Sequence, residues 1–276
     1  MKFTFIFLVI FKISFGAFAQ NDSSKVRSSS PYTTSFKVDG PVIGAGLGLA
    51  TLGLSMIQKK DALTVAEVNA LSKKDVNGFD RFGAGYYSDK ANKDSYLPFY
   101  GSFAMPVVAL LNKNIGRKAG QVMVLYLETM AITGTMYTLS AGSVVRHRPL
   151  VYSTDAPMGK RQSKNSQRSF FAGHTAATAA ATFFTAKVFS DFNPDSKARP
   201  YVWAAAAIVP ASVGYMRLKA GQHFLSDNLL GYGLGAAAGI LVPHLHKKKN
   251  GLTENLSIQP LMDGRYQGMV MNYRFK

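Results

Sequence analysis

The chain has 276 residues, of which 47% are hydrophobic and only 17% are charged, and its formal net charge is +17. So small a charged fraction is unusual for a soluble protein and indicates apolar surface that is covered by lipid or by other helices. The positive balance favours phospholipid headgroups or phosphate substrates, and no RNA- or DNA-binding signature accompanies it, so nucleic acid is not expected as a partner. The absence of cysteine excludes disulfide bonds and thiolate metal sites.

Residues 1–19 have the pattern of a secretory signal peptide. Lys2 precedes an apolar run, and the small residues Ala17 and Ala19 stand at the expected cleavage positions. Lys12 interrupts the apolar core, so a retained membrane anchor is the alternative. Residues 20–94 are expected to be a lead-in that contains one apolar helix at 40–57 and a short amphipathic helix. A capping box formed by Thr64 and Glu67 would open that second helix.

Five more apolar segments follow, at residues 97–111, 119–140, 171–189, 201–215 and 228–245. Together with 40–57 they predict an all-α fold, a bundle of about six helices whose main domain covers residues 95–246. A membrane-embedded bundle and a soluble periplasmic bundle both fit segments that are short and rich in Ala and Gly, and we favour the membrane. Glu128 is expected to face protein, because a carboxylate within a membrane helix avoids lipid.

The tail at residues 247–276 alternates between apolar and polar residues after a basic start. That pattern predicts a β-hairpin that turns around Asp263 and Gly264. His244 and His246, at the end of the last apolar segment, are interpreted as having no functional role.

Polar clusters stand at the ends of the apolar segments. The first, around Arg148, follows segment 119–140, and the second, around His174, opens segment 171–189. The third lies between the last two segments and contains Arg217, His223 and Asp227. Because consecutive helices alternate in direction, the end of one and the start of the next share a face. We therefore expect the three clusters to meet at one end of the bundle.

The third cluster has the residue types of a histidine nucleophile. Asp227 lies one helical turn after His223, so both side chains would emerge on one helix face. Its carboxylate could then hold one imidazole nitrogen and leave the other free to attack phosphorus.

The remaining residues would bind and activate a phosphoryl group. Arg148 and Arg217 would neutralise its non-bridging oxygens, and Gly173 at a helix start would bring backbone N–H groups close to an anion. His174 would donate a proton to the leaving alcohol and then activate the water that hydrolyses a phosphohistidine. This chemistry requires no cofactor and no metal ion, and the carboxylates of the sequence do not cluster.

The order and spacing of these residues resemble the type 2 phosphatidic acid phosphatase / vanadium haloperoxidase superfamily. Its signature is Lys-x6-Arg-Pro, then Pro-Ser-Gly-His, then Ser-Arg-x5-His-x3-Asp. The resemblance covers about residues 95–245 and implies a helical bundle, metal-independent phosphatase chemistry and the roles given above. The matching stretches here are Ala141-x6-Arg148-Pro149, then Phe171-Ala172-Gly173-His174, then Met216-Arg217-x5-His223-x3-Asp227.

Four positions depart from that signature. Ala141 stands for the Lys, Phe171 and Ala172 stand for the Pro and Ser of the second stretch, and Met216 stands for the Ser of the third. A lost hydrogen bond to developing charge costs about 10²–10³ in rate. Cations that could compensate are Arg146, Lys219, Lys160 and Arg161.

The leading hypothesis is a metal-independent membrane phosphatase that removes phosphate from a lipid phosphomonoester or pyrophosphate. The alternatives are a soluble periplasmic acid phosphatase of the same family and a non-catalytic phospholipid-binding protein. We expect a place in the cell envelope of a bacterium, in the inner membrane with the site facing the periplasm. That orientation requires residues 40–57 not to span the membrane. The sequence makes no prediction about oligomeric state.

Overall fold

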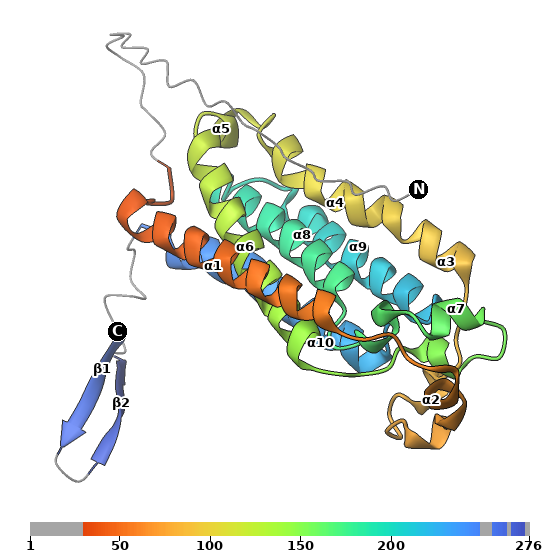
Figure 1. Ribbon diagram of the computed structural model, residues 1–276. Coiled ribbons are helices and arrows are strands. Elements are labelled where there is room, and N and C mark those ends of the chain that lie inside the picture. The colour runs from red at the N-terminus through yellow and green to blue at the C-terminus, as the bar shows by residue number, and fades with distance from the viewer. Residues whose placement is uncertain (1–29, 249–255, 264–265, 274–276) are drawn as a thin grey trace, which may run out of the picture.

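The computed structural model describes residues 30–248, 256–263 and 266–273. The expected signal peptide and the turn of the expected hairpin therefore lie outside the described residues. The described part is almost entirely helical, which confirms the all-α prediction, and its long helices form a bundle (Figure 1). Two strands, β1 (Leu256–Asp263) and β2 (Tyr266–Tyr273), pair in antiparallel register with Leu256 opposite Tyr273.

Each of the six apolar segments of the sequence corresponds to one long helix. The helices are α1 (Phe36–Lys59), α4 (Tyr96–Ala109), α6 (Ala119–Ser143), α8 (Gly173–Phe192), α9 (Arg199–Lys219) and α10 (Leu225–Leu245). Four short helices lie between them: α2 (Val65–Ala70), α3 (Asp89–Asp94), α5 (Lys113–Gly116) and α7 (Met158–Arg161). Four 3-10 turns complete the helical elements: η1 (Lys73–Asp75), η2 (Arg81–Gly83), η3 (Pro149–Tyr152) and η4 (Lys164–Gln167). The expected capping box of Thr64 and Glu67 opens α2.

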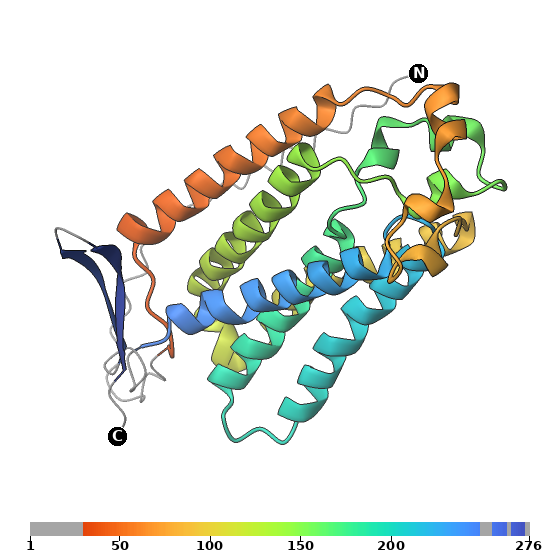
Figure 2. The same ribbon diagram turned by 90° about the horizontal axis from the view of Figure 1, so that it is seen from below.

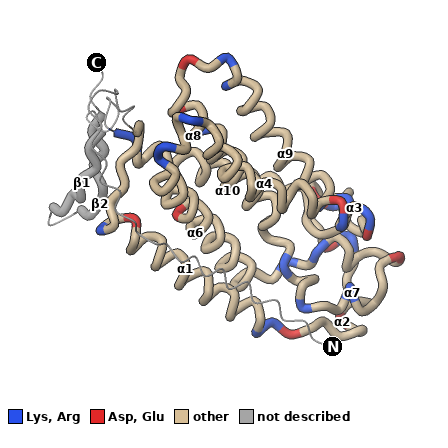
Figure 3. The backbone as a smooth tube through the Cα atoms, turned by 90° about the horizontal axis from the view of Figure 1, so that it is seen from above, with Lys and Arg blue, Asp and Glu red and all other residues tan. Residues whose placement is uncertain are grey.

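Helix α8 lies at the centre of the bundle, where it packs against α10, α9, α4 and α6, and α1 lies along the outside of α6 (Figure 2). Charged residues gather at the two ends of the bundle, and the helical shafts between them carry few (Figure 3). The ends of α1, α6 and α9 and the starts of α4, α8 and α10 share one end, with α2, α3 and α7 around them. We call this the loop end, and the other, where α1 and α6 begin and α10 stops, the far end.

Glycines on α10 allow it to approach α8 very closely. A Cβ atom added at Gly235 would lie 2.0 Å from the Ala176 carbonyl oxygen, and one at Gly231 would lie 2.6 Å from that of Ala172. Both obstacles are backbone atoms, which cannot rotate away as a side chain could. Glycines spaced four residues apart on one helix therefore fix the distance between the second and third polar clusters.

Three of the described helices, α1, α6 and α10, are long and apolar enough to cross a membrane. Helix α1 has 24 residues and a mean hydropathy of 1.6, and it runs parallel to α6, with Gly46 beside Ala131 and Gly53 beside Thr138. By length and composition α1 is therefore a candidate membrane span, and our expectation that residues 40–57 do not cross the membrane stays a prediction. If α6 crosses the membrane, α1 crosses it in the same direction.

Candidate active site

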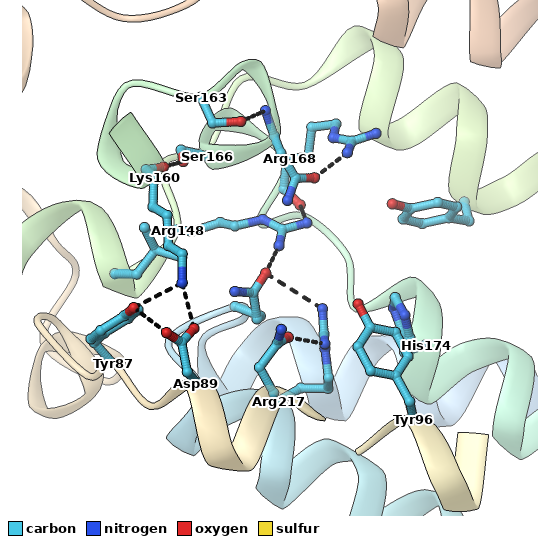
Figure 4. A pocket seen from close by; sticks show the side chains of 15 residues that line it. Tyr87, Asp89, Tyr96, Arg148, Lys160, Ser163, Ser166, Arg168, His174 and Arg217 are labelled. Atoms are coloured by element: carbon cyan, nitrogen blue, oxygen red, sulfur yellow. Dashed lines mark hydrogen bonds and ion pairs between the residues drawn. The ribbon is translucent and has the colours of Figure 1, made fainter. Parts of the chain in front are cut away.

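The loop end of the bundle contains a cavity of about 420 Å³ lined by side chains from all three polar clusters. Arg148 reaches it from the turn after α6, His174 from the first turn of α8 and Arg217 from the last turn of α9 (Figure 4). The structure thus brings these three predicted residues together. His223 is buried and does not line the cavity, but Gln222, its neighbour in the chain, does.

The two arginines lie in the wall of the cavity with donors to spare. Arg148 and Arg217 are 3% and 2% exposed, yet the Nε atom of each has no hydrogen-bond partner. Burial, the charge of Arg217 and that of Arg168 lower the pKa of Arg148, which remains cationic at neutral pH. A buried cation with an unused donor is costly, and an anion that accepts from it removes that cost.

The side chain of Gln222 bridges the two arginines. Its Oε1 accepts a hydrogen bond from Nη1 of Arg148 and a longer one, of 3.4 Å, from Nη2 of Arg217. An acceptor oxygen therefore lies between the two guanidinium groups. Nothing in the sequence pattern distinguished Gln222 as a member of the site.

The turn that carries Gln222 and His223 depends on a glycine. Gly221 has φ +68°, and a Cβ atom there would lie 1.9 Å from the Tyr86 carbonyl oxygen. Its own carbonyl accepts a hydrogen bond from the Leu150 N–H, which ties this turn to the arginine-bearing turn after α6. The positive φ and the tight contact together make glycine necessary at this position.

Residues of α3 and of the first turn of α4 complete the cavity and its surroundings. Asn92 at the end of α3 accepts a 2.7 Å hydrogen bond from Nη1 of Arg217, and the ring of Tyr96 lies 5.9 Å from the same guanidinium. The Tyr96 and Phe99 rings of α4 pack on the His174 imidazole, with centroids 5.7 and 4.3 Å away. These contacts join residues 75 to 125 positions apart, and the sequence reasoning missed them.

Of the cations expected to compensate for Ala141, only Lys160 lines the cavity. It donates to Asp89 at 2.5 Å and to the Tyr87 hydroxyl at 2.9 Å. Arg168, which the sequence analysis did not single out, lines the cavity as well and donates to Asn165.

The other expected auxiliary cations do not reach the cavity. Lys219 lies over the rings of Tyr86 and Tyr215, and Arg161 donates to the Val151 carbonyl. Arg146 pairs with carboxylates behind the site instead. The structure therefore gives no support to the expected auxiliary roles of Arg146 and Lys219, which stay predictions.

The hydrogen bond of His223 defines its tautomer. Nδ1 lies 2.6 Å from the Ser169 carbonyl oxygen, and because a carbonyl only accepts, Nδ1 carries the hydrogen. The neutral ring then has a free lone pair on Nε2, as a nucleophile requires. Burial, followed by the charges of Arg148 and Arg217, holds the pKa of His223 well below its usual value, so the ring is neutral at pH 7.

Among the described residues no hydrogen bond joins Asp227 to His223, so the structure does not show the direct pairing that we expected. Its Oδ2 accepts from the Ser169 hydroxyl at 2.6 Å and from the Phe224 N–H at 3.0 Å, and its Oδ1 accepts from Arg146. Asp227 thus fixes Ser169, whose carbonyl orients His223. The helix cap at Phe224 competes for the carboxylate, and the spacing of two residues by one turn could not show this.

Asp227 also belongs to a network of hydrogen-bonded polar side chains that does not line the cavity. Asp80 accepts from Ser226 through its backbone N–H and its hydroxyl, and Arg146 donates to both Asp80 and Asp227. Burial would raise the pKa of the Asp80 carboxyl, but the hydrogen bonds from Ser226, Asn77 and Arg146 outweigh burial and lower it. Asp80 precedes the expected bundle by many residues, so its position had no interpretation from sequence.

The second signature stretch, residues 171–174, has no hydroxyl to offer the site, because Ala172 stands in place of the Ser. Ala172 and Phe171 are buried, and the Ala172 N–H donates to the Asp227 carbonyl oxygen. Gly173 opens α8 against the Tyr137 ring, where a Cβ atom would lie 2.6 Å from the ring carbons. Gly173 does not line the cavity, so close packing against Tyr137 accounts for the glycine, and its expected role in phosphate binding is not tested.

The far end holds a second polar group of different composition. Asp39 of α1, Glu128 of α6 and His246 after α10 each offer a ligand atom, and these atoms lie within 4.8 Å of one another. The expectation that the carboxylates do not cluster is therefore wrong. Glu128 is buried among protein side chains, and His246, expected to have no role, lies beside it.

A known protein family matches the part of this chain that contains the three polar clusters. No curated protein matches the sequence. One similar solved structure is the first transmembrane PAP2 type phosphatidylglycerolphosphate phosphatase from Bacillus subtilis, with 19% identity and a TM-score of 0.36, over 76% of this chain and 96% of that chain. At those values it carries no argument about activity. Residues 122–251 match the model of the PAP2 superfamily. The matched residues hold all three polar clusters, so the similarity to the PAP2 superfamily covers most of the residues that line the cavity.

Proposed function

We propose that this protein is a metal-independent membrane phosphatase that hydrolyses a lipid phosphomonoester or pyrophosphate through a phosphohistidine. The observation that carries the proposal is the pair of buried arginines, Arg148 and Arg217, each with an unpartnered Nε in one cavity beside His174. Two fixed cations can bind and neutralise a phosphoryl group as negative charge develops on it.

The reaction begins when a phosphate oxygen replaces Oε1 of Gln222 between the two guanidinium groups. Displacement of that side chain opens the path to His223, which lies directly after it in the chain. Nε2 of His223 then forms a bond to phosphorus while the bond from phosphorus to the ester oxygen breaks. The hydrogen bond from Nδ1 to the Ser169 carbonyl keeps the ring in the required tautomer throughout.

His174 supplies the proton that the leaving alcohol needs. Burial and the charges of Arg217 and Arg148 lower the pKa of His174 to about 3, so the ring is neutral in the free protein. The negative charge of the bound phosphate must raise that pKa before the imidazolium can donate to the departing oxygen. The neutral ring then takes a proton from water, which attacks the phosphohistidine and releases inorganic phosphate and free His223. Arg148 and Arg217 hold the oxygens in both steps, so the departure at Ala141 leaves two of the three expected cations in place, with Lys160 and Arg168 nearby.

A lipid substrate fits the outer surface of the bundle beside the cavity. Leu97 and Tyr100 of α4 are 82% and 63% exposed, next to the Tyr96 and Phe99 rings that pack on His174. An acyl chain could lie along this apolar face while the phosphate enters between the arginines. This arrangement favours a lipid phosphate over the soluble esters of the alternative reading.

The test is phosphate release from a panel of lipid phosphates and one aryl phosphate, with detergent-purified protein in the presence of EDTA. We expect release from lipids in preference to the aryl ester, loss of release in His223→Ala, and full release in His244→Ala, an exposed histidine at the far end. Equal release by His223→Ala would exclude the nucleophile. Phosphate binding without turnover in the unmodified protein would support the non-catalytic alternative.

We further propose that the loop end faces the periplasm of a bacterial inner membrane. Basic residues at the far end, including Lys113, Lys118 and Lys247, favour the cytoplasmic side for that end. Because α1 runs parallel to α6, residue 30 would then also lie on the cytoplasmic side. A signal peptide cleaved after Ala19, or a membrane anchor retained with Lys2 in the cytoplasm, would each place it in the periplasm instead. A periplasmic site therefore requires that residues 1–19 do not direct the following residues across the membrane.

Single cysteines decide the orientation, since the chain has none of its own. Gly159→Cys reports on the loop end, and Lys197→Cys reports on the exposed connection between α8 and α9 at the far end. With a membrane-impermeant maleimide on spheroplasts, we expect Gly159→Cys to react at once and Lys197→Cys to react only after lysis. The reverse pattern would place the site in the cytoplasm.

A further inference from the structure

The cluster of Asp39, Glu128 and His246 has a charge arrangement that requires a cation. Nδ1 of His246 lies 2.8 Å from the Val242 carbonyl oxygen, which only accepts, so Nδ1 carries a hydrogen. In the neutral ring Nε2 is therefore an acceptor. Yet Nε2 faces two carboxylate oxygens, Oδ1 of Asp39 at 3.0 Å and Oε2 of Glu128 at 3.4 Å. Three acceptors this close repel one another unless a positive charge lies between them.

A proton on Nε2 satisfies only part of this group. It can point at Asp39, which lies nearer, and it then leaves Oε2 of Glu128 without a donor. That oxygen is buried, has no hydrogen-bond partner, and belongs to a residue that is 6% exposed. A metal ion bonds to all three atoms at once and so accounts for the unpartnered oxygen.

We propose that Asp39, Glu128 and His246 bind one divalent transition-metal ion, with Zn²⁺ the best match. Zn²⁺ binds imidazole nitrogen and carboxylate oxygen at about 2.0–2.2 Å in tetrahedral geometry, which places neighbouring ligand atoms about 3.3–3.5 Å apart. The observed separations of 3.0 and 3.4 Å from Nε2 to the two oxygens are close to these edges. Three protein ligands leave the fourth position to a water molecule.

The groups around the cluster are those that orient metal ligands. The second ring nitrogen of His246 donates to a backbone carbonyl, as most metal-bound histidines do. The second oxygen of Asp39 accepts a 2.7 Å hydrogen bond from the Ser35 N–H, which fixes the rotation of that carboxylate. The ligands come from the start of α1, the body of α6 and the end of α10, so the ion would hold the outer helix to the bundle.

Metal content tests the proposal in the full-length protein, purified in detergent with an affinity tag that contains no histidine. The protein is stripped with a chelator, equilibrated with Zn²⁺, passed through a desalting column and analysed by elemental mass spectrometry. We expect about one zinc per chain in the unmodified protein and in His244→Ala, two residues from the proposed ligand and exposed. His246→Ala and Glu128→Gln should fall to background. Equal zinc in the unmodified protein and His246→Ala would overturn the site.

Thermal unfolding of the unmodified protein is a second test, and it does not require any variant to fold. Zn²⁺ should raise the melting temperature of the unmodified protein, and a chelator should reverse the rise, because a ligand bound only by the folded state stabilises it. In Asp39→Asn the affinity should fall by more than the roughly 10–100-fold that loss of an outer partner costs. A melting temperature of the unmodified protein that is indifferent to Zn²⁺ would show that a proton alone lies on His246, and would reject the metal.

Discussion

The two ends of the bundle differ in the sign of the buried groups that keep an unpartnered atom: arginines at the loop end and a carboxylate at the far end. At the loop end, two buried arginines that line a cavity each have an unpartnered Nε donor, and the carboxylates around them are paired with Lys160 or Arg146. At the far end, two buried carboxylates and an imidazole face one another, and the unpartnered atom is an acceptor. Spare donors favour an anion and spare acceptors favour a cation. The unsatisfied atom thus indicates the sign of the missing partner at each end.

The largest effect should follow removal of either cavity arginine. Arg148→Met or Arg217→Met removes charge-assisted hydrogen bonds to the developing phosphoryl charge, and we expect kcat/KM for phosphate release to fall by about 10²–10³. Arg199→Met, which changes an arginine at the far end, serves as the control and should leave kcat/KM unchanged. A similar loss in all three variants would mean that total charge, rather than the cavity, matters.

The close contact between α8 and α10 extends along the bundle, and substitutions in it should have the next largest effect. Gly235→Ala would place a Cβ atom 2.0 Å from the Ala176 carbonyl, and forcing the helices apart should cost about 1–3 kcal/mol of unfolding free energy. Gly233→Ala, on the same helix with nothing within 4 Å of the added atom, should be neutral or slightly stabilising. Unfolding by denaturant in detergent compares them, and equal stability would disprove the close approach.

Because Asp227 acts on His223 through Ser169, we expect a smaller effect on kcat from a change at Ser169. Ser169→Ala removes the hydroxyl through which Asp227 fixes the Ser169 carbonyl, and we expect kcat to fall about tenfold, equivalent to about 1.4 kcal/mol, with KM little changed. Direct pairing of Asp227 with His223 would make Ser169→Ala harmless. Steady-state kinetics beside Ser163→Ala, another serine of the cavity wall, separate the two accounts.

The mildest expectation concerns pH. Because burial and the arginines lower the pKa of His223, the folded protein keeps that ring neutral below pH 6.5, where an unperturbed histidine takes up a proton. The acidic limb of kcat/KM due to the nucleophile should therefore lie below pH 6.5. The same shift makes His223 cost folding stability as pH falls below 6.5, since the unfolded chain then binds the extra proton. An acidic limb at or above 6.5 would contradict the buried, arginine-flanked position.

Much of this arrangement could be predicted from local sequence. Apolar runs of about 15 to 20 residues located the six long helices, and their alternation placed Arg148, His174 and Arg217 at one end. Local sequence did not reveal which partner a polar group chooses. Asp227 accepts from Ser169, Phe224 and Arg146, and two of these donors come from parts of the chain that only folding brings to it.

Contacts between distant parts of the chain were beyond sequence reasoning for the same reason. Asn92 binds Arg217 across 125 positions, and Asp39 meets His246 across 207. A lone histidine at a helix end gives no sign of the carboxylates that folding brings to it. The sequence analysis therefore gave His246 no functional role and treated Glu128 separately, and the cluster is visible only in the folded chain.

The most direct test of the account is to trap the covalent intermediate. His174→Ala is mixed with an aryl phosphate whose leaving group needs no proton, quenched in base, digested and analysed by mass spectrometry. The account predicts a phosphoryl group on the peptide that contains His223, accumulating because the variant cannot activate water. It should be absent from His174→Ala combined with His223→Ala. A phosphoryl group on another residue, or phosphate release with none trapped, would contradict nucleophilic attack by His223.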